Sequence, residues 1–101
     1  MFPLKVRDFV KGLTRLTTNN ELQWDYLYHE DKAIASGPLF HVELRYWFNT
    51  EMERPEFFLD YTPAKSAQSH RFSTVMGETD FEIAAELYDM ARASKLSFPS
   101  L

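Results

Sequence analysis

Residues 40–48 read FHVELRYWF, and large apolar side chains occupy every second position of this stretch. A period of two is typical of a β-strand, because successive side chains of a strand point to opposite faces of the sheet. We therefore predict a strand over residues 39–48. Its apolar face would carry Phe40, Val42, Leu44, Tyr46 and Phe48. Its other face would carry His41, Glu43, Arg45 and Trp47.

Three more stretches have the same alternation and predict strands over residues 22–29, 56–61 and 70–76. The segments between the strands are rich in turn-forming residues, and residues 30–38 are predicted to be a loop that ends in Ser-Gly-Pro. None of these connections is long enough to hold a crossover helix. The four predicted strands therefore form an antiparallel meander.

Both ends of the chain have the pattern of amphipathic helices. Over residues 3–18 apolar side chains recur three and four positions apart, which is the spacing of one helical face. The same spacing predicts a second helix over residues 80–95. Thr79 and Glu82 match a capping box at the start of this second helix. Residues 96–101 are predicted to be a frayed tail.

These elements predict one α+β domain that spans residues 1–101. The chain has the length of a single ordinary domain, and aromatic residues make up 16% of it, which is ample material for a core. The predicted order is α-β-β-β-β-α, with both helices packed side by side on the apolar face of a four-stranded sheet. This order resembles that of many small bacterial and phage proteins, a likeness of architecture that transfers no site residues. The other face of the sheet would be open to solvent or to a partner.

The composition excludes several kinds of site. The chain has no cysteine, which rules out disulfides, thiolate nucleophiles and iron–sulfur clusters. It also has no glycine-rich phosphate loop, so we predict no cofactor. His29, Glu30 and Asp31 are adjacent in sequence, and neighbours in a turn seldom converge on one ion. We interpret these three residues as a solvated turn and predict no metal site.

The expected cellular location follows from the charge and the hydropathy of the sequence. The formal net charge is −4, which argues mildly against bulk affinity for nucleic acid or for an anionic membrane. No stretch approaches the roughly 20 apolar residues of a membrane span, and the first residues do not have the pattern of a secretion signal. A cytoplasmic protein is therefore the expectation.

One hypothesis for function is a small enzyme. His41 and Glu43 are two residues apart on the predicted strand and share its outward face, which suits a base and its orienting partner. Cross-strand polar pairing is the commoner reason for such residues on a sheet face. A two-layer protein of this size also has little room for a cleft that excludes water. We therefore predict a protein that is not an enzyme, and keep this dyad as an alternative.

A second hypothesis is a nucleic-acid-binding module. The first 20 residues contain four basic side chains and one acidic side chain. A basic helix beside outward aromatic rings could follow a phosphate backbone. Acidic residues on the outward sheet face, such as Glu43 and Asp60, would repel it. The basic residues are Lys5, Arg7, Lys11 and Arg15.

The leading hypothesis concerns the outward face of the predicted sheet. Trp47 and Phe58 fall on neighbouring strands of that face with Arg45 beside them, and these residue types are enriched at protein interfaces. Coverage by loops, by the tail or by a shifted register would explain the same residues without a partner. We predict a small binding or adaptor protein, acting as an inhibitor or as a homodimer. The predicted contact residues are Leu27, Leu39, Arg45, Trp47 and Phe58.

Overall fold

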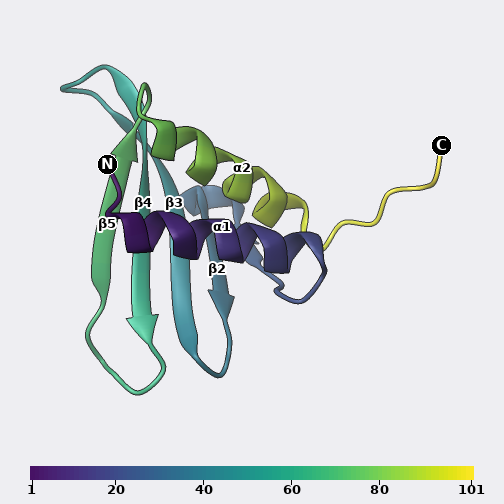
Figure 1. Ribbon diagram of the computed structural model, residues 1–101. Coiled ribbons are helices and arrows are strands. Elements are labelled where there is room, and N and C mark those ends of the chain that lie inside the picture. The colour runs from purple at the N-terminus through teal and green to yellow at the C-terminus, as the bar shows by residue number, and fades with distance from the viewer.

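The sheet has five antiparallel strands, not the four that were predicted. In the computed structural model, which covers residues 1–101, the strands lie side by side in chain order, so the predicted meander is confirmed (Figure 1). The α+β class is confirmed as well, since two helices accompany the sheet. The strands are β1 (Asp25–Leu27), β2 (Lys32–Ser36), β3 (Phe40–Asn49), β4 (Arg54–Pro63) and β5 (His70–Val75).

The additional strand is β2, which lies inside the segment predicted as a loop over residues 30–38. Its inward side chains are Ala33 and Ala35, which are buried but small. Alanine is depleted in strands, so this alternation is a weak sequence signal. Pairing along the whole length of β2 with β3 keeps the segment extended. Tertiary pairing thus overrides the local preference.

The first strand is shorter than the one predicted over residues 22–29. Only Asp25–Leu27 is paired, and a 3₁₀ turn at Tyr28–Glu30 follows. Asp31 then adopts the left-handed backbone conformation, with a φ of 49°, and the chain reverses into β2. Aspartate is one of the few residues that tolerate this conformation, so the turn is allowed without a glycine.

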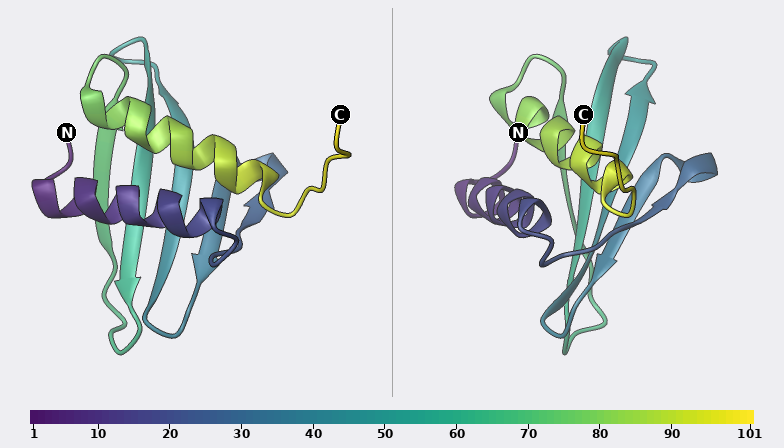
Figure 2. Two further views of the ribbon diagram at one scale, coloured as in Figure 1. Left: turned by 45° about the vertical axis from the view of Figure 1, so that its right-hand side comes forward. Right: turned by 90° about the vertical axis from the view of Figure 1, so that its right-hand side faces the viewer.

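Both helices lie on one face of the sheet, as predicted. Helix α1 (Leu4–Thr18) and helix α2 (Thr79–Ala93) each cross the sheet from the β5 side toward the β1 side, and they run side by side (Figure 2). The edge-on view in Figure 2 shows that neither helix covers the opposite face of the sheet. The tail after α2 extends away from the body of the protein.

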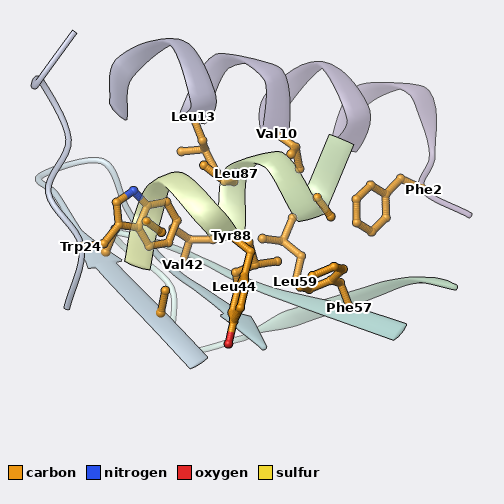
Figure 3. Close-up of a cluster of buried hydrophobic side chains, with 14 residues drawn as sticks. Phe2, Val10, Leu13, Trp24, Val42, Leu44, Phe57, Leu59, Leu87 and Tyr88 are labelled. Atoms are coloured by element: carbon orange, nitrogen blue, oxygen red, sulfur yellow. The ribbon is translucent and has the colours of Figure 1, made fainter. Parts of the chain in front are cut away.

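The core fills the space between the helices and the sheet (Figure 3). Trp24 is the largest fully buried side chain, and its indole N–H donates to the Thr17 hydroxyl of α1 at 2.9 Å. Phe40, Val42 and Leu44 of β3 pack in the core, as the period-two pattern predicts. Tyr46 and Phe48, which the pattern assigns to the same apolar face, are 37% and 49% exposed at the end of the strand. The main buried side chains are Val10 and Leu13 of α1, Val42 and Leu44 of β3, Phe57 and Leu59 of β4, and Leu87 and Tyr88 of α2.

The start of α2 differs from the predicted capping box. Thr79 and Glu82 make no capping hydrogen bond, and Glu78 occupies the N-cap position. The Glu78 carboxylate instead accepts hydrogen bonds from the Val75 backbone N–H at 2.9 Å and from the Thr74 hydroxyl at 3.0 Å. The bond from Val75 contributes most to a pKa of Glu78 below its ordinary value. The Glu78 side chain therefore fastens the start of α2 to the end of β5, and the first N–H groups of the helix have no side-chain cap.

Asp80, in the first turn of α2, connects the two helices and is fully buried. Its carboxylate accepts a hydrogen bond from the Phe2 backbone N–H at 2.9 Å and another from Arg7 Nε at 2.6 Å. Burial alone would raise the pKa of Asp80, but the bonds from Arg7 and Phe2 outweigh it and hold the pKa below its ordinary value. The partial positive charge at the helix N-terminus also favours an anion at this position.

Candidate functional site

The open face of the sheet, which neither helix covers, brings three predicted contact residues together. The strand register places Trp47 directly opposite Glu56, and it places Arg45 directly opposite Phe58. Directly opposite side chains have Cβ atoms roughly 4.5–5.5 Å apart, so these four residues form one group. The group spans β3 and β4 near the hairpin that joins them.

A hollow of about 610 Å³ lies over this group. We call it the Trp47 hollow. Trp47 is 50% exposed there, whereas Glu56 is only 8% exposed. The volume of the hollow is within the range of about 300–1,000 Å³ that is usual for ligand sites. The lining residues are Arg45, Trp47, Asn49, Thr50, Glu51, Glu56, Phe58 and Arg71.

One aromatic wall of the Trp47 hollow already has a cation above it. The guanidinium carbon of Arg71 lies 5.0 Å from the centre of the Phe58 ring. Two hydrogen bonds to the Asp60 carboxylate, of 2.7 and 3.0 Å, hold Arg71 in this position. A cation–ring contact contributes about 0.5–1 kcal/mol at an exposed site. No cation of the chain lies over the ring of Trp47.

Glu56 is the most buried charged side chain that lines the hollow. Its Oε1 atom accepts a hydrogen bond from Asn49 Nδ2 at 3.3 Å. Glu56 takes part in none of the ion pairs of the structure, so its carboxylate has no cationic nitrogen within 4.0 Å. The other carboxylate oxygen, Oε2, makes no hydrogen bond within the protein, and it is not fully enclosed, because no fully buried side-chain oxygen lacks a partner. Glu56 can therefore accept a hydrogen bond from a donor that enters the hollow.

The other two predicted contact residues lie apart from this group. Leu27 is half-buried at the end of the edge strand β1, and Leu39 is exposed in the turn between β2 and β3. Leu39 lines a separate hollow near the end of α1. Sequence reasoning also missed Glu56 and Asn49 as members of the site. The alternation marks Glu56 as outward, but nothing in the alternation indicates that an outward glutamate would be buried.

The dyad of the enzyme hypothesis forms, and it belongs to a longer polar chain. His41 Nε2 lies 3.1 Å from Glu43 Oε2, Ser36 bonds the other ring nitrogen of His41, and Lys32 lies 3.0 Å from Glu43 Oε1. Burial would raise the pKa of Glu43, but hydrogen bonds from His41 and Lys32 hold it below its ordinary value. None of the surface hollows is lined by His41 or Glu43. A catalytic role of this dyad stays an untested alternative.

The basic residues of α1 divide into two sets. Arg7 is bonded to the buried Asp80 and therefore serves the fold. Lys5, Lys11 and Arg15 are exposed and form no ion pair, and they remain available for the nucleic-acid hypothesis. That hypothesis stays a prediction with three free cations instead of four.

Comparisons with known proteins add no family to this description. No protein-family model, no curated protein and no solved structure matches the chain. Neither helix of the structure has the length and apolar character that crossing a membrane requires. No group of three or more His, Cys, Asp or Glu side chains is arranged to hold a metal ion. Function must therefore be argued from the chemistry of the open face.

Proposed function

We propose that this protein is a small non-catalytic binding protein, acting in the cytoplasm through contact of its open sheet face with another protein. The observation that carries the proposal is the half-exposed side chain of Trp47, on a face that neither helix covers. Phe58 lies on the neighbouring strand β4, and Arg45 lies two residues before Trp47 on β3. Tryptophan and arginine are enriched among the residues that dominate binding energy at interfaces.

The charges of the open face favour a protein partner over a nucleic acid. Glu43 and Asp60 are directly opposite each other at the centre of the face, and Glu56 lies nearby on β4. Glu43 and Asp60 pair with Lys32 and Arg71, so these two cations are not free to bind phosphates, and the net charge of −4 would oppose the approach of a nucleic acid. A face that mixes both signs of charge with aromatic rings instead suits a protein surface of complementary charge. That surface belongs to a second copy of this chain or to a different protein.

Replacing Trp47 by alanine should weaken partner binding about thirty-fold, which corresponds to about 2 kcal/mol at a residue that dominates an interface. Self-association is measured by sedimentation equilibrium of the purified protein. For a different partner, the wild-type and variant proteins serve as matched baits, and the retained protein is purified and titrated by calorimetry.

The control is Phe98→Ala, which truncates an exposed aromatic ring in the C-terminal tail, away from the open face. This variant should associate like the wild type. The proposal fails if Trp47→Ala and the wild type bind the purified partner equally well. It also fails if the wild type neither self-associates nor forms a complex that maps to the open face by amide chemical shifts.

A further inference from the structure

The starting point is the balance of charge around the Trp47 hollow. Arg71 is neutralised by Asp60. Of the remaining charged residues that line the hollow, Glu51 and Glu56 are acidic and Arg45 is basic. The hollow therefore has an excess of negative charge, and its most buried charge is the unpaired carboxylate of Glu56. A cationic group of a partner would pair with this carboxylate and balance the excess negative charge.

A neighbouring arrangement in the same sheet shows which cation fits. Phe58, Asp60 and Arg71 combine an aromatic ring, a carboxylate and a guanidinium that bonds the carboxylate while lying over the ring. Trp47 and Glu56 also place an aromatic ring beside a carboxylate, here on directly opposite positions of β3 and β4, but no guanidinium of the chain joins them. A guanidinium suits such a site because its planar fork can stack on a ring and donate to a carboxylate at once.

We infer that the Trp47 hollow receives an arginine side chain of the partner protein, stacked on Trp47 and donating to Glu56. This inference rests on the proposed function and names the chemistry of the partner. The guanidinium of Arg45 does not fill the site, because it lies neither within 4.0 Å of the Glu56 carboxylate nor over the Trp47 ring. Instead, Arg45 should repel the incoming cation, so removing the charge of Arg45 should strengthen the binding of arginine.

The probe is N-acetyl-L-arginine amide, titrated into the ¹⁵N-labelled protein while the two indole N–H signals are followed by NMR. The signal of Trp47 should shift with a dissociation constant on the order of millimolar, as expected for a ligand of this size. The signal of Trp24 is an internal control, because this indole is buried and bonded to Thr17. N-acetyl-L-citrulline amide has nearly the same shape as the arginine derivative but no charge, and it should bind at least tenfold more weakly.

Three variants test the assigned roles. Glu56→Gln keeps an oxygen that can accept from Asn49 but removes the charge, so arginine binding should weaken at least tenfold. Arg45→Gln should strengthen arginine binding several-fold. Glu86→Gln removes an exposed charge on α2 and should bind like the wild type.

The inference is overturned if the citrulline derivative binds as well as the arginine derivative, or if Glu56→Gln binds arginine like the wild type. These results leave the proposed function intact wherever Trp47→Ala still weakens partner binding about thirty-fold. Normal partner binding by Trp47→Ala would instead remove the proposed function itself.

Discussion

Replacing Asp80 by asparagine should lower the free energy of unfolding by about 3 kcal/mol, although the side chains have nearly the same shape. Asp80 is fully buried and accepts from both Phe2 and Arg7. An amide offers only one oxygen, so its NH₂ group would face a donor, and one buried donor would lose its partner. Loss of one member of a buried, charged hydrogen-bonded group typically costs about 3–5 kcal/mol. Arg7 is partly exposed and can turn to water, which places the expected value at the low end.

The same contact predicts a dependence on pH. The pKa of Asp80 is lower in the folded protein than in the unfolded chain. Its contribution to stability is therefore complete above the unfolded pKa, about pH 4, and is lost as the pH falls through the folded pKa. The difference in unfolding free energy between wild type and Asp80→Asn should shrink as the pH falls from 7 to 2.

Urea unfolding at a series of pH values measures both effects. The matched control is Glu86→Gln, an exposed charge on the same helix, which should change stability by no more than about 0.5 kcal/mol. A difference for Asp80→Asn that stays constant down to the lowest pH would show that the carboxylate charge is not what stabilises the contact.

This contact also shows where prediction from sequence stops. The capping box was inferred from Thr79 and Glu82 because their spacing is local and visible. The actual partners of Asp80 are Phe2 and Arg7, more than 70 residues away in the chain. Only the packing of α1 beside α2 brings them together. Local patterns predicted the two helices and their common face, whereas the contact that joins the helices depends on tertiary structure.

The strands show the same division. The large alternating side chains of residues 40–48 predicted β3 almost to its ends, because bulky apolar residues mark the buried face directly. The alternation of Ala33 and Ala35 did not predict β2, because small side chains carry little hydrophobic signal. They are buried only because β3 and the helices enclose them. The predicted strand count was therefore one too low, although the antiparallel order was correct.

The candidate site could be predicted in part for a related reason. Period-two alternation assigns Arg45, Trp47 and Phe58 to one face, and pairing of β3 with β4 then places them together. The alternation also assigns Glu56 to that face, but it does not indicate that Glu56 is buried. The burial depends on the side chains around Glu56 and on Asn49. Leu39 has no such constraint, because it lies in a turn.

The two tryptophans provide the second large prediction, since one belongs to the core and the other to the open face. Trp24→Ala should lower the free energy of unfolding by about 4 kcal/mol, which is typical for deletion of a buried aromatic side chain. The loss has two sources. The cavity would lie where the chain enters β1, and the Thr17 hydroxyl would lose its indole partner. Trp24→Phe should cost less, because it retains one ring and loses mainly the hydrogen bond.

Trp47→Ala is the matched opposite case. Because half of this side chain is exposed, its truncation should lower stability by only about 1 kcal/mol or less, while partner binding should fall about thirty-fold. Urea unfolding of both variants, combined with the binding measurement, separates the two roles. A Trp47→Ala variant as unstable as Trp24→Ala would make Trp47 a core residue, because an exposed side chain has no comparable packing to lose. The open face would then be part of the structural support of the sheet, and its aromatic residues would no longer argue for a partner.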